Sequence, residues 1–141
     1  ALFREVIAAE EGRAELQNTV IRTVASRFNL IRAIEAQGRL EEADAAYVEF
    51  AELIRGVYPE RHWMHAGVAM SHGCVLVMQE RFEEGATLLE AAIDTLAKTF
   101  GEGHRNTQKG IRFLVQAYEG LGREADAAAV RDRLVETNGD G

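Results

Sequence analysis

One short segment recurs three times along the chain at a constant spacing. Residues 37–43 read QGRLEEA, residues 79–85 read QERFEEG, and residues 121–127 read LGREADA. In each copy an arginine, at positions 39, 81 and 123, is followed by acidic residues and then by a small residue. The interval between successive arginines is the repeat length. Self-similarity at a fixed spacing of about 40 residues is typical of stacked structural repeats, so the chain is expected to fold as a repeat array.

The apolar positions that follow the first copy recur at the same spacing. Seven positions on one face of a helix predicted over residues 40–56 are apolar, and the equivalent positions one repeat later are apolar or glycine. They are Leu40, Ala43, Ala46, Tyr47, Phe50, Ala51 and Ile54, matched by Phe82, Gly85, Leu88, Leu89, Ala92, Ile93 and Leu96. A chance match at seven positions would occur in roughly one chain in a hundred. Each repeat is predicted to be an antiparallel helical hairpin that buries its apolar face on its neighbour.

Helical periodicity predicts an all-α fold of about seven helices, arranged as an α-α superhelix. Asn18 or Thr19 is the predicted N-cap of the second helix, and Gly38 is its predicted stop. The helices are expected over residues 2–16, about 18–37, 40–56, 62–79, from 82 onward, 105–121 and 124–136.

The same periodicity divides the chain into a half-repeat, three whole repeats and a frayed tail. The half-repeat covers residues 1–17, the repeats about 18–59, 60–101 and 102–137, and the tail 138–141. The helix over 62–79 is apolar nearly all round, which predicts the most enclosed position in the array. The last helix carries Glu124 and Arg131 where the earlier copies are apolar, which is typical of a solvent-facing cap.

Composition narrows the class of protein. The apolar fraction of 47% and the charged fraction of 28% suit a folded single domain. A net charge of −7 disfavours nucleic-acid binding, which needs a basic face. The single cysteine favours a reducing cytoplasm, and no apolar run approaches the roughly 20 residues of a membrane span. Ala1 already lies in a helical pattern, so we expect a domain of a longer protein.

The repeats resemble the tetratricopeptide repeat family, in the long 42-residue form of kinesin light chains and many bacterial proteins. The residues that carry the resemblance are Leu30, Ile34, Gly38–Ala43, Tyr47, Phe50 and His62, then Leu76, Arg81–Gly85, Leu89, Ala92 and His104, then Leu114, Tyr118, Gly122, Arg123, Ala127 and Leu134. The middle copy departs furthest from the pattern, with His72 in place of a leucine and Glu80 in place of the turn glycine. Trp63 follows the loop histidine where the family often has proline.

The resemblance implies a right-handed superhelix whose concave groove is formed by the first helix of each hairpin. The groove residues it implies are Phe28, Asn29, Arg32, Met70, Cys74, Val77, Met78, Lys109, Arg112 and Gln116. An apolar floor between cationic rims suits an extended or helical peptide with hydrophobic anchors and an acidic or carboxylate group. In related arrays an asparagine at the place of Asn29 clamps ligand backbone, but the equivalent positions here are Ser71 and Phe113.

Arg105, Lys109 and Arg112 lie at i, i+4 and i+7, on one face of their predicted helix. One interpretation is an anchor for a ligand carboxylate. The other is a solvated face that balances nearby glutamates.

Metal binding and catalysis are not expected. His62, His65, His72 and Cys74 cannot close one tetrahedral site, because Cys74 falls about 200° beyond His72 around a helix. Structural roles are expected for the histidines. The sequence has no phosphate-binding glycine loop, no Gly-x-Ser-x-Gly turn and no His-Glu-x-x-His motif, so neither a cofactor nor an enzymatic activity is predicted.

The predicted function is a non-catalytic scaffold that binds a protein or peptide partner in its groove. The alternative is a regulatory or homodimerising segment that packs against an attached domain, for instance a serine/threonine kinase or a DNA-binding domain. Similar arrays form parts of larger bacterial regulators. A cytoplasmic protein with no nucleic-acid or membrane partner is expected in either case.

Overall fold

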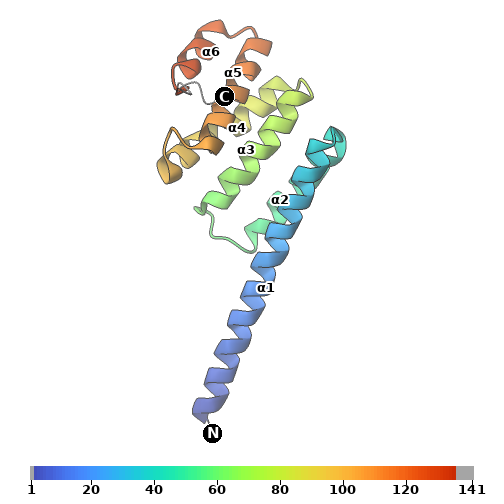
Figure 1. The fold of residues 1–141 in the computed structure, drawn as a ribbon, viewed down its shortest axis with the longest axis vertical. Coiled ribbons are helices and arrows are strands. Elements are labelled where there is room, and N and C mark those ends of the chain that lie inside the picture. Colours follow the sequence, from blue (N-terminus) through green and yellow to red (C-terminus); the bar gives the residue numbers. More distant parts are fainter. Residues whose placement is uncertain (1, 136–141) are drawn as a thin grey trace.

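The computed structural model describes residues 2–135, and the predicted frayed tail at 138–141 lies outside them. The described chain is helical, and each helix packs against the next one in sequence (Figure 1). The helices are α1 (Leu2–Ala36), α2 (Leu40–Arg55), α3 (Trp63–Met78), α4 (Phe82–Phe100), α5 (Arg105–Gly120) and α6 (Glu124–Arg131). The predicted all-α, repeat-like fold is confirmed. None of these helices has an apolar stretch long enough to cross a bilayer.

The first two predicted helices are one continuous helix, so the described residues form six helices and not seven. The prediction of a break near Asn18 was wrong, and the half-repeat over residues 1–17 is not a separate element. Thr19 does not cap a helix; its Oγ1 donates to the carbonyl of Glu15 at 3.0 Å, within the helix. A threonine can satisfy its hydroxyl on the preceding turn, and no proline or glycine at this point interrupts the backbone.

The outer part of α1 extends beyond the packed body of the molecule. In Figure 1 it projects past α2 and α3 to the N-terminal end. Only Val24 and Ile31 of α1 are buried, and every residue from 2 to 23 is exposed. At about 1.5 Å per residue, this outer part is roughly 33 Å long.

Each of the three hairpins turns through one residue with a positive φ. These residues are Gly38 at 77°, Glu80 at 62° and Gly122 at 72°. The residue that follows donates its backbone N–H to the carbonyl five residues back, as Arg81 does to Leu76 at 2.8 Å. This is the hydrogen bond of a Schellman C-cap, and glycine is its usual residue because it adopts a positive φ without steric cost. The middle corner therefore keeps the turn without the glycine.

The arginine of each corner precedes the next helix and pairs with a carboxylate three residues on. Arg39 pairs with Glu42 in α2, and Arg123 Nε lies 2.9 Å from Asp126 Oδ2 in α6. Arg81 Nη2 lies 2.7 Å from Glu84 Oε2 in the same way. The recurring segment of the sequence is thus a turn with its own ion pair. These pairs are exposed, so each stabilises the fold only slightly.

The helix α3 is the most enclosed, as predicted, because it contributes to two apolar cores. Val68 and Val75 pack into the core formed with α1 and α2, where Tyr47 is fully buried. Met70 and Cys74 pack into the core formed with α4, α5 and α6. Nine of its 16 residues are buried, so residues on almost every side of α3 are held by a neighbouring helix.

The close approach of α3 and α4 depends on two glycines. A Cβ on Gly73 would lie 2.8 Å from Leu89 Cγ, and a Cβ on Gly85 would lie 2.8 Å from Val77 Cγ2. The Cβ of Gly73 would also lie 3.2 Å from the carbonyl oxygen of Gly85. The small residue at the end of the recurring segment therefore lets the two helices of the middle hairpin touch.

The predicted helix over residues 124–136 is shorter than expected and ends at Arg131. The chain beyond it is held by the buried side chain of Gln108. Its Nε2 donates to the carbonyl of Arg133 at 3.1 Å, and its Oε1 accepts from the backbone N–H of Val135 at 2.9 Å. A glutamine amide satisfies a donor and an acceptor in one place, so a non-helical segment can pack there.

Candidate binding cleft

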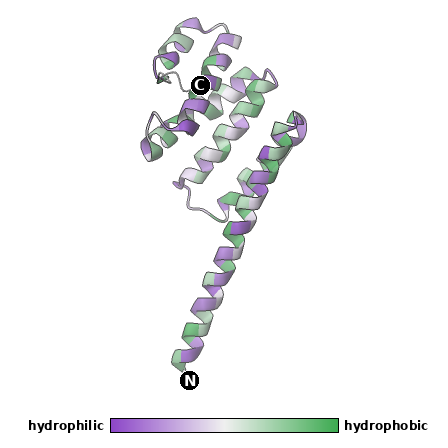
Figure 2. Cartoon of the chain, viewed as in Figure 1, coloured by the Kyte–Doolittle hydropathy of each residue, from purple (hydrophilic) through white to green (hydrophobic). Residues whose placement is uncertain are grey.

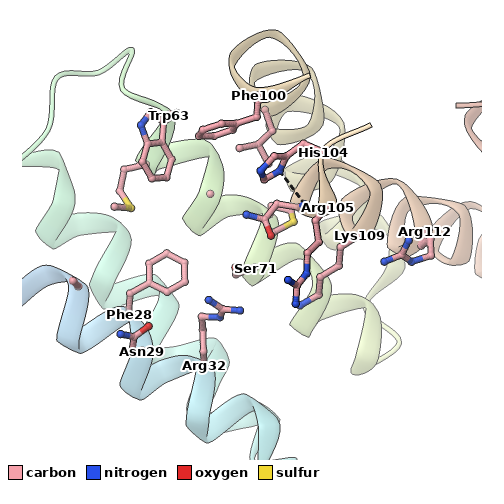
Figure 3. Close-up of a pocket in the computed structure, with 16 residues that line it drawn as sticks. Phe28, Asn29, Arg32, Trp63, Ser71, Phe100, His104, Arg105, Lys109 and Arg112 are labelled. Carbon is pink, nitrogen blue, oxygen red and sulfur yellow. Dashed lines mark hydrogen bonds between the residues drawn. The ribbon is translucent and has the colours of Figure 1, made fainter. Parts of the chain in front are cut away.

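A cleft of about 530 Å³ lies between α1 and α5, with α3 as its floor (Figure 3). Its volume is within the range of small-ligand and peptide-anchor pockets. The lining residues come from α1, α3, the end of α4 and the start of α5. They are Ala25, Phe28, Asn29, Arg32, Trp63, Met64, Gly67, Met70, Ser71, Leu96, Phe100, His104, Arg105, Asn106, Lys109 and Arg112.

One end of the cleft is aromatic. The rings of Trp63 and Phe100 meet edge to face, with centroids 5.3 Å apart, and Phe100 stacks on His104 at 5.0 Å. Trp63 is 39% exposed and Phe100 is 40% exposed, so both rings present apolar area to solvent. Large apolar side chains gathered on an exposed concave surface are typical of binding sites.

The other part of the cleft is cationic. Arg32 reaches in from α1, while Arg105, Lys109 and Arg112 lie along one face of α5 (Figure 3). No carboxylate lines the cleft, and none of these four side chains forms an ion pair within residues 2–135. The whole chain carries a net charge of −7. A cluster of cations in an acidic protein creates a local positive field that attracts an anion.

The nearest acidic neighbour on α1 is already engaged elsewhere. Glu35 follows Arg32 by one turn, and its Oε2 accepts a hydrogen bond from Tyr47 Oη at 2.9 Å. Burial and the neighbouring carboxylate raise the pKa of Tyr47 well above its ordinary range, so its hydroxyl remains a donor at neutral pH. Glu35 therefore pairs with Tyr47 of α2, and it forms no ion pair with a cation of the cleft within residues 2–135.

Six of the ten predicted groove residues line this cleft. They are Phe28, Asn29, Arg32, Met70, Lys109 and Arg112. Met78 and Gln116 are exposed but lie outside the lining. Both occupy the far ends of their helices.

The remaining two predicted groove residues belong to the core. Cys74 is 0% exposed and Val77 is 4% exposed, because both belong to the apolar core that α3 forms with α4 and α5. Their placement on a concave surface was wrong. Burial raises the pKa of Cys74 to about 12, so the thiol is protonated and enclosed. A thiol in this state is a poor nucleophile.

The aromatic end of the cleft was not predicted as part of the groove. Trp63, Phe100 and His104 line it, although none was among the groove positions inferred from the first helices of the hairpins. A signal was present, because Tyr58 and Phe100 are one repeat length apart, as are His62 and His104. Aromatic and histidine residues that recur in the loops between repeats, where a turn does not require them, indicate side chains that contact one another between successive repeats.

The two loop histidines cap helices. His62 Nδ1 accepts the backbone N–H of Met64 at 3.1 Å at the start of α3, and His104 Nδ1 accepts that of Asn106 at 3.2 Å at the start of α5. Each replaces one of the hydrogen bonds missing from the first turn of a helix. No three potential metal-ligating side chains come together in the part of the chain that is described.

The third histidine of interest joins two repeats. His72 Nε2 donates to Asp44 Oδ1 at 2.6 Å, and Arg81 Nη1 donates to Asp44 Oδ2 at 2.6 Å. Burial alone would raise the pKa of Asp44, but these two hydrogen bonds outweigh it and hold the pKa below its ordinary value. The ring of His72 also stacks on Tyr47 at 5.8 Å. His72 therefore connects α3 to α2, on the side of α3 away from the cleft.

No protein-family model matches the chain, and no curated protein sequence matches it either. The case for a function therefore depends on the cleft and its chemistry.

Proposed function

We propose that the chain is a non-catalytic binding module, similar to a tetratricopeptide repeat array, that takes a peptide or a protein segment in the cleft. The observation that carries the proposal is the combination, in one concave surface, of exposed aromatic rings and four cations that have no carboxylate partner among residues 2–135. Exposed rings and unneutralised cations both gain stability when a complementary ligand covers them.

The composition of the cleft favours a ligand that is apolar at one end and acidic at the other. An aromatic or aliphatic side chain fits against Trp63 and Phe100, and Met70 also lines the cleft. A carboxylate fits among Arg32, Arg105 and Lys109, because guanidinium groups bind carboxylates with two parallel hydrogen bonds. The amide of Asn29 lies between these ends on α1 and suits the backbone of an extended peptide.

The rigidity of the hairpins supports binding. The floor of the cleft is α3, which is packed on both sides, and the start of α5 is fixed by the His104 cap. A preformed surface loses little conformational freedom on association, so most of the ordering cost falls on the ligand. We place such a module in the cytoplasm, in keeping with its single, protonated cysteine.

A peptide library that varies acidic and aromatic positions tests the proposal. We expect hits that combine an acidic group with a large apolar residue, and we expect Arg32→Glu to weaken them by about tenfold or more, because it places a like charge beside the ligand carboxylate. The matched control is Arg22→Glu, which makes the same charge change on the exposed surface of α1 outside the cleft. Hits that are indifferent to both changes would exclude the cleft as the site.

A second pair of variants tests the apolar end. Trp63→Ala removes a ring from the cleft and is expected to weaken the same hits, whereas Met78→Glu alters an exposed residue of α3 outside the lining and is expected to leave them unchanged. The affinity of wild-type protein should fall as salt is added, because the cationic part is exposed to solvent. Absence of any hit, together with a cleft covered in a stable assembly, would favour the regulatory alternative.

A further inference from the structure

The outer part of α1 carries a stripe rich in apolar residues that none of the residues from 2 to 135 covers. From Val24 to Ile34 this side of α1 packs against α2. Beyond α2, the outer part of α1 still carries hydrophobic residues among hydrophilic ones (Figure 2). Positions spaced alternately by three and four residues define the middle of the stripe. They are Phe3, Val6, Glu10, Arg13, Gln17 and Val20. Spacing of this kind is typical of a helix that pairs with another helix along its length.

Three of these six seam residues are apolar, and the positions that flank the seam are apolar throughout. The positions on either side of it are Leu2, Ile7, Ala9, Ala14, Leu16 and Ile21. The opposite side of the helix carries mainly polar or charged residues, among them Arg4, Glu5, Glu11, Glu15 and Arg22. Phe3 is 77% exposed and Leu16 is 66% exposed, so the stripe is accessible. An exposed side of a helix that gathers apolar residues along its length marks an interaction surface.

We propose that a second copy of this chain covers the stripe, with the two α1 helices antiparallel. The charges in the middle of the seam decide the partner and its direction. When Glu10 is placed opposite the partner's Arg13, the two-fold symmetry places Arg13 opposite the partner's Glu10. The same register places Phe3 opposite the partner's Val20 and Val6 opposite the partner's Gln17. Two ion pairs thus occupy the centre, a Val6–Gln17 pair flanks them on each side, and an apolar Phe3–Val20 contact occupies each end.

Other arrangements of two copies lose this complementarity. A parallel pair in register would place Glu10 against the partner's Glu10 and Arg13 against the partner's Arg13, and like charges in a seam are destabilising. An antiparallel pair shifted by one heptad toward the N-terminus would place Phe3 against the partner's Arg13. The arrangement that matches every charge with its opposite is the antiparallel one centred between residues 10 and 13.

This dimer is compatible with the packing of the rest of the chain. α2 covers the stripe from the end of α1 back to about Val24, and it runs antiparallel to α1. The partner helix would run in the same direction as α2 and continue where α2 ends. The cleft residues on α1 begin at Ala25, outside the proposed interface. In this register the two Phe28 residues lie about 50 Å apart along the helix axis, so both clefts remain open to one bivalent partner.

The mass of the full chain in solution tests the proposal. Light scattering across a concentration series is expected to give a mass that approaches twice 15.6 kDa. Glu10→Arg is expected to weaken the dimer by about tenfold or more, because the new arginine of each copy faces Arg13 of the other copy and both ion pairs become repulsive. Glu11→Arg makes the same charge change on the polar side of α1 and is expected to have no effect. The exchanged pair Glu10→Arg with Arg13→Glu is expected to restore the dimer.

Cross-linking tests the direction of the two helices. Chains carrying Phe3→Cys are mixed with chains carrying Val20→Cys and oxidised, and the antiparallel dimer is expected to give the mixed disulfide. Phe3→Cys alone is expected to give none. A monomer at all concentrations, a dimer indifferent to Glu10→Arg, or a disulfide formed by Phe3→Cys alone would each overturn the proposal. None of these outcomes bears on ligand binding in the cleft, which peptide titration measures separately.

Discussion

The middle hairpin, α3–α4, and the terminal helix α6 repeat the same sequence pattern in different surroundings. Leu89 in α4 is 0% exposed, packed between α3 and α5. The equivalent position one repeat later is Arg131 in α6, which is exposed and pairs with Glu119. Helix α4 packs against α3 on one side and α5 on the other, whereas the main packing partner of α6 within residues 2–135 is α5. The repeat determines where a side chain lies on its helix, and the neighbours determine whether it is buried.

The joints between repeats differ in a second way. Asp44 ties the first hairpin to the second through His72 and Arg81. The equivalent positions in the next two repeats are Ala86 and Ala128, which carry no hydrogen-bonding group on their side chains. Ala86 is instead buried in the second apolar core. The joint between the first and second hairpins therefore has a charged connection at this position. The next joint has apolar packing there, and its polar connection comes from Tyr118 Oη, which donates to Glu90.

The largest expected effect separates the middle hairpin from the terminal helix. Leu89→Ala is expected to lower the free energy of unfolding by about 2–5 kcal/mol, because it leaves a cavity among residues held on two sides. Val130→Ala in α6, where the side chain is only half-buried, is expected to cost well under half of that. Urea unfolding followed by circular dichroism measures both. Equal losses at the two sites would contradict the contrast between an enclosed and a terminal helix.

A smaller effect is expected at the polar joint. Asp44→Asn removes the charge that His72 and Arg81 share, and at pH 7 it is expected to cost about 1–2 kcal/mol of stability. The pKa of Asp44 is lower in the folded protein than its ordinary value of 3.8, so the unfolded chain takes up the proton first as the pH falls. The stabilisation is therefore complete above about pH 4 and is lost as the pH falls below it.

Unfolding measured at pH 7 and near pH 3 tests this dependence. The difference between wild type and Asp44→Asn is expected to shrink as the pH falls. The control is Glu49→Gln on the exposed side of α2, which is expected to have little effect at either pH. A difference that is constant between the two values, or that grows in acid, would show that the joint does not depend on the charge of Asp44.

The fold was largely predictable because repetition and periodicity are local properties of the sequence. The three corners at positions 38, 80 and 122 and the enclosed position of α3 followed from the constant spacing of the recurring segment and from apolar patterning. The break in α1 was predicted wrongly because Asn18 and Thr19 are common N-caps. Cap residues permit a helix start but do not require one, and an unbroken helix satisfies Thr19 equally well.

The site was predictable only in part, because it depends on how far one repeat covers the next. The pattern of the first helices placed Arg32 and Lys109 in the cleft. The same pattern could not indicate that Cys74 is buried. Its burial depends on how closely α5 approaches α3, and that distance depends on the volumes of the side chains of α4. It also did not place Trp63 beside Phe100, because these residues are far apart in the sequence and meet only where the start of α3 and the end of α4 come together in the folded hairpin.

The smallest expected effect concerns the middle corner, and its sign is the opposite of the others. Glu80 adopts a φ of 62°, where the two equivalent corners have glycine. A left-handed conformation costs a non-glycine residue about 1–2 kcal/mol, and replacing Glu80 with glycine removes this cost. Glycine also gives the unfolded chain more conformational freedom, which offsets part of the gain in stability. Glu80→Gly is therefore expected to stabilise the protein by about 0.5–1 kcal/mol in urea unfolding.

The converse change supplies the control for this corner. Gly38→Ala and Gly122→Ala, which place a Cβ at the same positive φ, are each expected to destabilise the protein by about 1 kcal/mol. If Glu80→Gly destabilised the chain while both alanine variants behaved as expected, the Glu80 side chain would contribute a favourable interaction larger than its backbone strain. In that case glutamate would stand at the middle corner because its side chain stabilises the fold, and not because the corner merely tolerates the loss of glycine.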